Sequence, residues 1–240
     1  MSNGLQIDRW AFWSPESESP SEWLAHWRST AAPRSSADVP AHALPATHRR
    51  RMSALSKLSV QIGMQAARDS PADFLVFCSQ HGELARSREL LGSIARGTEL
   101  SPTSFSQSVH NTSAGLFTII SQTRAPATAL ASGASTFAYG WLEAEAYLAE
   151  HPSGRVLLVS YDEPLPAEYL PYSKQQQCLY AAALMLSTGT GGCVELARAP
   201  AASDEALPMA PLFLAWWLSA ESSLQISADG QGWAWSRRAA

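Results

Sequence analysis

Residues 101–115, SPTSFSQSVHNTSAG, and residues 132–146, SGASTFAYGWLEAEA, decide the fold of this chain. Between them, residues 125–130 are predicted to form a short strand. The second stretch opens a predicted helix over residues 135–150, because apolar residues recur there at three- and four-residue steps. These residues are Phe137, Trp141, Ala144 and Leu148. The sequence therefore predicts a proline-bounded loop, a strand and a turn into a buried helix.

Predicted helices and strands alternate on both sides of this region. Residues 53–68 carry apolar side chains at helical spacing, and the apolar runs at 73–79 and 155–161 are typical of buried parallel strands. Further strands are predicted at residues 5–13, 178–186, 189–196 and 232–236, and further helices at 83–94, from 112 and at 211–220. This alternation predicts an α/β fold in which helices are layered on a mixed sheet.

The length and composition fit one domain. The chain has 240 residues and is 46% hydrophobic, so it can bury one substantial core, and we expect a single domain over residues 1–240. Residues 14–45 are rich in Ser, Pro and Ala around a short helical pattern at 21–27, which predicts a surface excursion. Residues 203–240 are expected to add a C-terminal helix and strand.

The charge pattern excludes two classes of partner. A net charge of −4 argues against binding to nucleic acid or to an anionic membrane, and basic residues cluster only at 48–51. Residues 1–13 lack the pattern of a signal peptide, and the longest apolar run, residues 210–218, is too short for a bilayer span. We therefore expect neither export nor membrane insertion.

The three cysteines, Cys78, Cys178 and Cys193, are odd in number and widely spaced, which indicates neither a disulfide framework nor a zinc site. A reducing cytoplasm fits this usage, and we expect neither a metal nor another cofactor. Cys78 ends a predicted buried strand and Cys178 lies in another, whereas a reactive thiol needs a partly exposed, electropositive setting. Both are therefore interpreted as buried apolar filling.

Three motifs carry a resemblance to a known family. They are the turn Ser79-Gln80-His81-Gly82-Glu83, the loop that ends in Ser108-Val109-His110-Asn111, and the pair Ala138 and Gly140 in the following helix. With these motifs, residues 5–196 resemble the N-terminal half of β-ketoacyl synthases, and most closely the short synthase-like proteins known as chain-length factors. The resemblance implies a half-size thiolase-like fold without the second half that supplies catalytic basic residues in that family.

In that family a cysteine in a Thr-Ala-Cys motif, on the turn from strand to helix, accepts the acyl chain as a thiolate. Here residues 128–134 read Thr-Ala-Leu-Ala-Ser-Gly-Ala, without cysteine. The register leaves Leu130, Ser132 and Gly133 open as the equivalent position. We prefer Ser132, because an insertion within a buried helix costs more than one in the turn. A serine without an adjacent base is a poor nucleophile, so Ser132 is expected to cap the helix N-terminus.

His81 and His110 are the histidines within these motifs. As catalytic residues they need a nucleophile within hydrogen-bonding reach, and the sequence offers no good one. The interpretation that we favour is structural. Asn111 is expected to be the N-cap of the next helix, and His110 is expected to hydrogen-bond loop backbone.

The resemblance also implies an interface and a tunnel. In the thiolase-like fold the strand before the nucleophile pairs with its two-fold mate, and the preceding loop and helix shape the partner's acyl tunnel. Carried over to this chain, the interface residues are Ala125, Pro126, Ala127, Thr128, Ala129 and Leu130. The expected tunnel and chain-length residues are Phe105, Val109, Leu116 and Phe117. Large side chains there close the tunnel and small ones lengthen it.

Together these features predict a non-catalytic, chain-length-factor-like subunit. It is expected to form a heterodimer with a full-length ketosynthase and to shape the tunnel in which an acyl-carrier-protein-bound chain is extended, in an aryl polyene or a fatty acid or polyketide system. Lacking the condensing cysteine, the chain is not expected to be an enzyme by itself. One alternative is a truncated acyltransferase or ketosynthase that uses Ser132 or Cys178 with His81 or His110. Another is a homodimeric protein that binds acyl chains or carrier proteins.

Overall fold

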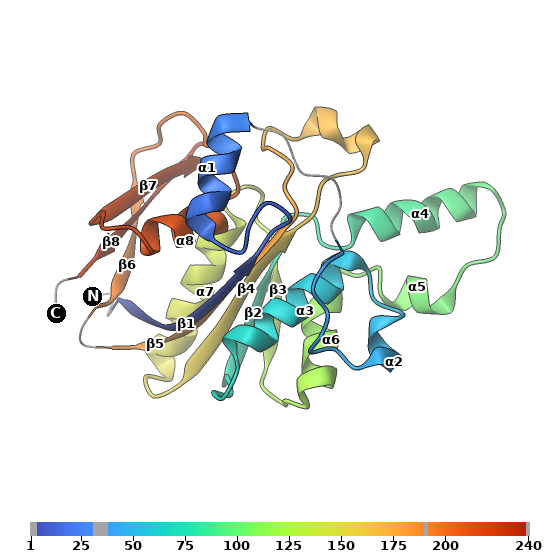
Figure 1. Cartoon of the computed structure of the whole chain (residues 1–240), viewed down its shortest axis with the longest axis horizontal. Helices are drawn as coiled ribbons and strands as arrows, with labels where there is room; N and C mark the ends of the chain where they lie inside the picture. The colour runs from blue at the N-terminus through green and yellow to red at the C-terminus, as the bar shows by residue number, and fades with distance from the viewer. Residues whose placement is uncertain (1–3, 31–37, 190–191, 239–240) are drawn as a thin grey trace.

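The computed structural model describes residues 4–30, 38–189 and 192–238. Within these residues eight strands form one sheet in the order β3-β2-β4-β5-β1-β6-β8-β7 (Figure 1). The strands are β1 (Leu5–Trp13), β2 (Phe74–Cys78), β3 (Ala127–Leu130), β4 (Arg155–Asp162), β5 (Tyr180–Thr188), β6 (Val194–Ala199), β7 (Ser223–Ala228) and β8 (Gln231–Arg237). Strand β2 runs parallel to β3 and β4, and the other pairs are antiparallel. The predicted α/β fold with a mixed sheet is confirmed.

Helices cover both faces of this sheet (Figure 1). They are α1 (Pro20–Thr30), α2 (Ala46–Arg49), α3 (Ala54–Ala66), α4 (Leu84–Ala95), α5 (Pro102–Ser106), α6 (Thr112–Ser121), α7 (Thr136–Glu150) and α8 (Met209–Trp217), with a 3₁₀ helix, η1 (Ala167–Tyr172). Helices α3 and α6 contribute to the core on one face, and α1, α7 and α8 to the core on the other.

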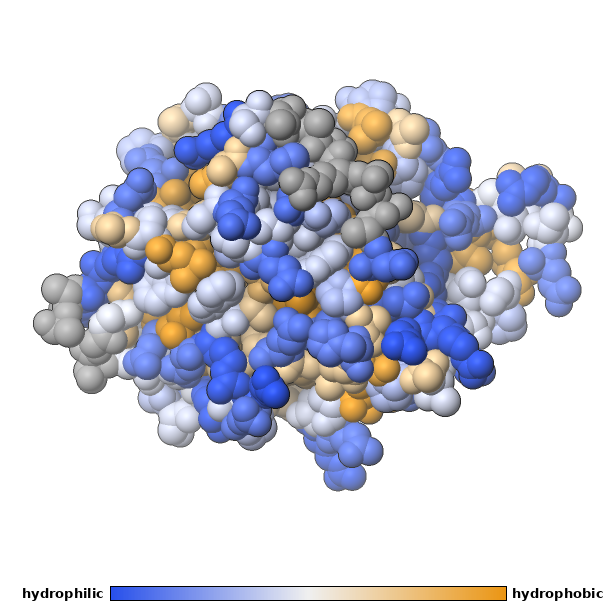
Figure 2. Space-filling view, viewed as in Figure 1, coloured by the Kyte–Doolittle hydropathy of each residue, from blue (hydrophilic) through white to orange (hydrophobic). Residues whose placement is uncertain are grey.

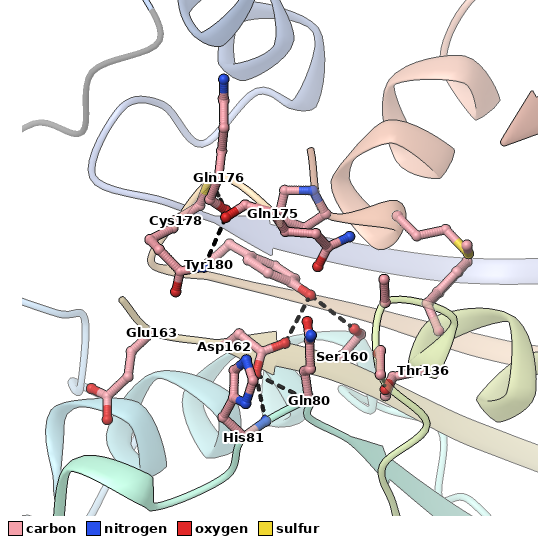
Figure 3. A pocket seen from close by; sticks show the side chains of 16 residues that line it. Gln80, His81, Thr136, Ser160, Asp162, Glu163, Gln175, Gln176, Cys178 and Tyr180 are labelled. Atoms are coloured by element: carbon pink, nitrogen blue, oxygen red, sulfur yellow. Dashed lines mark hydrogen bonds between the residues drawn. The ribbon is translucent and has the colours of Figure 1, made fainter. Parts of the chain in front are cut away.

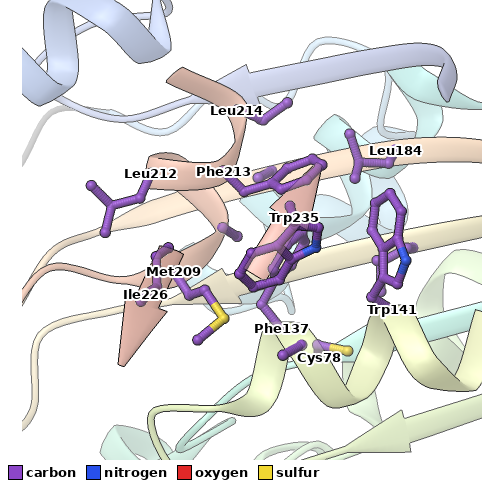
Figure 4. Close-up of a cluster of buried hydrophobic side chains, with 14 of the residues drawn as sticks. Cys78, Phe137, Trp141, Leu184, Met209, Leu212, Phe213, Leu214, Ile226 and Trp235 are labelled. Carbon is purple, nitrogen blue, oxygen red and sulfur yellow. The ribbon is translucent and has the colours of Figure 1, made fainter. Parts of the chain in front are cut away.

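The central strands are buried on both faces, so alternate residues of one strand belong to different cores. Val76 and Cys78 of β2 lie in the core under α7 and α8, whereas Leu75 and Phe77 lie in the core under α3. In Figure 4 the side chains of α7 and α8 meet in the first of these cores. Helix α7 approaches β2 closely at Gly140, where a Cβ atom would collide with the Cys78 sulfur. This glycine therefore fixes how the helix lies on the sheet.

The prediction of a surface excursion at residues 14–45 is wrong for helix α1. Trp23 and Trp27 are buried, with 0% and 3% exposure, and their rings lie 6.3 Å apart in the core shared with α8. Their spacing of four residues places both on one helix face. Serine and proline in the flanking sequence outweighed this signal in the prediction. Residues 31–37 of the predicted excursion lie outside the described residues.

The C-terminal region contains one strand more than predicted. Strand β7 pairs with β8, and this hairpin extends the sheet beyond β6, while α8 covers a sheet face. The prediction missed β7 because SLQISA carries its apolar side chains among serines and a glutamine. The predicted loop before residue 112 likewise contains the short helix α5. Its N-cap residue, Ser101, accepts a hydrogen bond from the N–H of Ser104 at 3.3 Å.

Candidate functional site

The turn from β3 into α7, here called the elbow (residues 131–135), lies at the carboxyl end of the parallel strands β2, β3 and β4. Gly133 has a positive φ of 55°, which favours glycine. The N–H of Ser132 donates to Thr136 Oγ1 at 2.8 Å, and that hydroxyl donates to the carbonyl of Gly133 at 2.6 Å. The N-cap residue of α7 is Ser135, so the predicted capping role of Ser132 is wrong.

A carboxylate from the far end of the chain enters the elbow. Asp229, at the turn between β7 and β8, accepts a hydrogen bond from the N–H of Ala134 at 2.7 Å. Its Oδ2 atom also lies in the space that a side chain at residue 133 would fill. Sequence analysis missed this residue, because nothing in the motifs links position 229 to a turn nearly 100 residues earlier.

Asp162, the last residue of β4, organises the turn that follows β2 (Figure 3). Its carboxylate accepts hydrogen bonds from Ser79 Oγ at 2.8 Å, from the N–H of Gln80 at 2.9 Å and from the N–H of His81 at 3.3 Å. Tyr180 of β5 donates a longer bond of 3.4 Å. Sequence analysis missed Asp162, although an acidic residue at the end of a buried strand is a usable signal.

Removal from water raises the pKa of Asp162 from 3.8 to about 7, and its hydrogen-bond donors only partly offset this. The neighbouring Glu163 also has a pKa raised to about 7, first by burial and then by the charges of Glu83 and Asp162. Glu83 is itself buried and accepts a hydrogen bond from Ser53 Oγ at 2.7 Å. The carboxyl end of the parallel strands therefore gathers acidic groups.

The two motif histidines have different environments. His110 Nε2 lies 2.8 Å from the carbonyl oxygen of Ser79, so the expectation that it bonds to backbone is confirmed. Gly82 makes room for this ring, because a Cβ there would lie 2.8 Å from His110 Cδ2. Asn111 occupies the N-cap position of α6, although its side chain forms no capping hydrogen bond. Burial lowers the pKa of His81, which favours its neutral form at pH 7.

A cavity of about 480 Å³ lies beside the elbow, between the turn after β2 and the β7–β8 turn. It is lined by His81, Ala134, Lys174 and Asp229, with Tyr169 and Tyr172 on the side of η1. A smaller cleft next to it contains Asp162, Gln175 and Cys178 (Figure 3). These groups can donate and accept hydrogen bonds.

Of the two expected alternative nucleophiles, Cys178 is not activated. Burial raises the pKa of the Cys178 thiol well above its ordinary value, so little thiolate is present at neutral pH. Ser132 is half-buried in the elbow, two residues before Ala134, whose N–H is bonded to Asp229. Cys78, at the end of β2, is fully buried, and burial raises its pKa as well. Among the described residues, no group of histidine, cysteine and acidic side chains has the arrangement of a metal site.

The expected tunnel residues fall into two groups. Phe105 and Val109 are 65% and 50% exposed, and Leu116 is half-buried. Phe117 is only 3% exposed and packs in the core, where its ring centroid lies 5.5 Å from that of Phe77. Phe117 is therefore a core residue, whose side chain fills space between α6 and β2.

Phe105 and Val109 belong to a projecting part of the molecule, here called the arm (residues 84–110). Helices α4 and α5 extend away from the body on the side opposite the C-terminal hairpin (Figure 1), and hydrophobic side chains lie among hydrophilic ones on the arm (Figure 2). Leu90 is the buried residue of α4, whereas Leu91 and Ile94 are 60% and 59% exposed. The arm thus exposes four large apolar side chains.

Strand β3, which contains most of the expected interface residues, lies at the edge of the sheet. It pairs with β2 on one side, and it begins at Ala127, two residues later than predicted. Ala127 and the preceding Pro126 are exposed, and the other residues from Ala125 to Leu130 are half-buried. Within the described part of the chain, no strand pairs with the second side of β3, which therefore has the backbone groups of an edge strand.

Comparison with protein families identifies the class to which this fold and elbow belong. A model of the β-ketoacyl synthase N-terminal domain matches residues 23–236. The chain therefore belongs to the β-ketoacyl synthase family. The match extends 40 residues beyond residue 196, where the resemblance was expected to end, so it includes α8 and the C-terminal hairpin.

The solved structures narrow this assignment. A chain in the complex of the ketosynthase ApeO with its chain length factor ApeC, from Xenorhabdus doucetiae, is 30% identical, with a TM-score of 0.82. The alignment covers 98% of this chain and 99% of that one, so the two chains have nearly the same length. This chain is thus a half-size, ketosynthase-like protein.

More distant structures share the fold. A chain of the ishigamide ketosynthase/chain length factor is 14% identical, with a TM-score of 0.58 over 81% of this chain and 67% of that chain. A β-ketoacyl synthase from Burkholderia phymatum STM815 is also 14% identical, with a TM-score of 0.61 over 83% and 65%. These likenesses confirm the expected thiolase-like fold. A comparison with proteins of curated function finds no match. Among the described residues, no helix is long and apolar enough to span a membrane.

Proposed function

We propose that this chain is a non-catalytic, chain-length-factor-like subunit that pairs with an active ketosynthase. The observation that carries the proposal is the elbow, which lacks a thiol and whose Ala134 N–H is already bonded to Asp229. A condensing enzyme needs a thiolate there and free donors for the oxyanion. The likeness to a chain in a ketosynthase–chain length factor complex supports the same conclusion.

The partner surface combines the β3 edge with the arm. An exposed strand edge can pair with a strand of another chain, and large exposed apolar patches mark interaction sites. Burying one side chain such as Leu91, Ile94 or Phe105 contributes about 1.5–3 kcal/mol. A complex in which a full-length ketosynthase covers the arm is therefore stabilised, because apolar residues that are exposed in the isolated chain become buried.

Phe105, Val109 and Leu116 are the proposed chain-length residues. Phe105 and Val109 are exposed on the arm, and Leu116 of α6 is half-buried against the core, so each keeps some surface that a partner can contact. In the heterodimer their size sets how far an acyl chain extends along the interface. The growing chain is carried by an acyl carrier protein, and the product is an aryl polyene, a fatty acid or a polyketide. The three cysteines are buried, which suits a reducing cytoplasm.

Co-expression with a full-length ketosynthase tests this function. Affinity purification through the ketosynthase, followed by size-exclusion chromatography, is expected to give a one-to-one complex. Condensation by the complex is expected to depend on the presence of this chain. A ketosynthase that elutes alone and is equally active without this chain contradicts the proposal. The enzyme alternative requires the isolated chain to become labelled by an acyl thioester.

A further inference from the structure

We infer that Asp229 is a built-in plug: the tip of the β7–β8 hairpin places its carboxylate in the elbow and closes the position where an acyl group is accepted in condensing enzymes. The plug forms within this chain and needs no partner. Its consequence rests on the proposed function, because a closed elbow leaves the acyl chain on the ketosynthase. The C-terminal hairpin thereby acts on the site as well as extending the sheet.

The hairpin turn is built to present this side chain. Ala228 pairs with Gln231, so Asp229 and Gly230 are the two turn residues, with φ values of 52° and 69°. Two-residue turns of this kind favour Asp-Gly, because both positions lie in the left-handed region. Asp204 Oδ1 accepts a hydrogen bond from the N–H of Gly230 at 3.1 Å. The carboxylate is therefore positioned by its own turn before any partner binds.

Hydrogen bonds along the seam between the hairpin and α7 hold the plug in register. Ser135 Oγ donates to the carbonyl of Ala228 at 3.2 Å and accepts a bond from Trp233 Nε1 at 3.0 Å. One turn along the helix, Tyr139 donates to Gln231 Oε1 at 3.1 Å. These contacts fix both strands of the hairpin against the start of α7, and Trp233 is buried. The position of Asp229 thus follows from a packed interface.

Space and charge at the elbow both fit a carboxylate. Residue 133 is glycine with a positive φ, and any Cβ there would collide with Asp229 Oδ2. The bonded N–H of Ala134 lies just before the 15-residue helix α7, where the helix dipole favours a negative charge. A second anion, such as the oxyanion of acyl transfer, would meet an occupied donor and a like charge. The elbow is therefore closed to acyl chemistry even if a thiol is supplied.

A cysteine placed in the elbow of the full chain reads out the plug without any partner. The variants are Ser132→Cys with the native hairpin, and Ser132→Cys combined with Asp229→Asn or Asp229→Ala. The rate of alkylation by iodoacetamide is measured from pH 5 to 10, with the wild-type chain as the background for its three buried cysteines. Ser132→Cys combined with Asp204→Asn is the matched control, because Asp204 accepts its hydrogen bond from the turn residue Gly230, whereas Asp229 accepts one from Ala134 of the elbow.

With the native hairpin, the new thiol is expected to react no faster at pH 7 than in the urea-unfolded variant. Asp229→Asn is expected to lower the thiol pKa by about one unit and to raise the rate at pH 7 about tenfold, since only the thiolate reacts. Asp204→Asn is expected to change the rate less than twofold. Equal pH profiles with and without the Asp229 carboxylate overturn the plug.

A second measurement decides the matter if the Asp229 variants do not fold. The Ser132→Cys chain with its native hairpin is then compared only with its own unfolded form. A folded-state rate at pH 7 above the unfolded rate overturns the plug, because an open helix N-terminus activates a thiol. An equal or lower rate supports it. None of these outcomes depends on ketosynthase binding, so the plug and the proposed function can fail separately.

Discussion

The elbow and the arm differ in whether their groups have partners within the chain: the donors of the elbow are hydrogen-bonded, whereas apolar side chains of the arm are exposed. At the elbow the donors and the available space are taken by residues of the same chain, through Asp229 and Thr136. On the arm, Leu91, Ile94 and Phe105 remain largely exposed although they are among the larger apolar residues of the chain. A site whose donors and space are occupied by the chain itself leaves no room there for a substrate. An exposed apolar surface, in contrast, indicates a partner. This difference is the basis of the proposal that the chain acts through a partner and not through its own elbow.

Charged substitutions on the arm should have the largest effect, and the quantity affected is the affinity for the ketosynthase. We expect Phe105→Asp with Val109→Asp to weaken binding to the ketosynthase roughly 100-fold or more, because each lost burial costs about 1.5–3 kcal/mol. Isothermal titration of the two purified proteins measures the affinity. Leu218→Asp is the matched control, since Leu218 is 43% exposed at the end of α8, away from the arm. Equal losses from both variants would show that the arm has no special role.

Gly133→Ala sharpens the account of the elbow. The left-handed backbone alone costs about 1–2 kcal/mol with a non-glycine residue, and the collision with Asp229 adds to this. Gly97→Ala is the control, because Gly97 has a φ of 65° with nothing within 4 Å of its added Cβ. Urea unfolding is expected to show the larger loss for Gly133→Ala. Adding Asp229→Gly to Gly133→Ala should restore only the part of the unfolding free energy by which Gly133→Ala loses more than Gly97→Ala. If nothing is restored, the residue at position 133 does not collide with Asp229.

The acidic groups near the elbow predict a pH dependence. Asp162 and Glu163 have folded-state pKa values of about 7, above their ordinary values of 3.8 and 4.5. The folded state therefore binds more protons than the unfolded state between about pH 4 and 7. The stability that these groups contribute is complete below about pH 4 and is lost as the pH rises through 7, by up to about 1.4 kcal/mol per pH unit for each group.

Asp162→Asn tests this assignment. It is expected to reduce the slope of unfolding free energy against pH between pH 4.5 and 7 by at least about half, because it removes one titrating group and also a charge that raises the pKa of Glu163. Glu150→Gln, at the exposed end of α7, is the control and should leave the slope unchanged. A slope that Asp162→Asn does not alter would mean that Asp162 is charged throughout this range.

The smallest expected effect is on product length. Leu116→Ala should shift the products of the reconstituted complex toward longer chains by about one extension step, because a smaller wall residue lengthens a tunnel. Mass spectrometry of the released products measures the shift. Phe117→Leu, one residue further along α6 but in the core, is the control and should change stability rather than length. The same length profile for Leu116→Ala and the wild type would remove Leu116 from the tunnel.

Periodicity and apolar runs predicted the elements that hold the sheet together. The helix with Phe137 and Trp141 on one face and the buried strand at β2 were both found, since local spacing determines them. Strand β7 was missed because its apolar side chains lie among serines and a glutamine, and the burial of Trp23 was missed because serine and proline dominate the sequence around α1. Sequence also located the elbow, but it assigned the helix cap to Ser132. Asp229 could not be found from local pattern, because its role arises when a distant hairpin packs on α7.

The central claim is that this chain acts only through a ketosynthase, and a titration tests it most directly. Increasing amounts of the purified chain are added to a fixed amount of purified ketosynthase with acyl carrier protein, and condensation is followed. We expect activity to rise and to level off at one chain per ketosynthase, with none from the chain alone. Activity that is independent of the added chain, or condensation by the chain without ketosynthase, would contradict the claim.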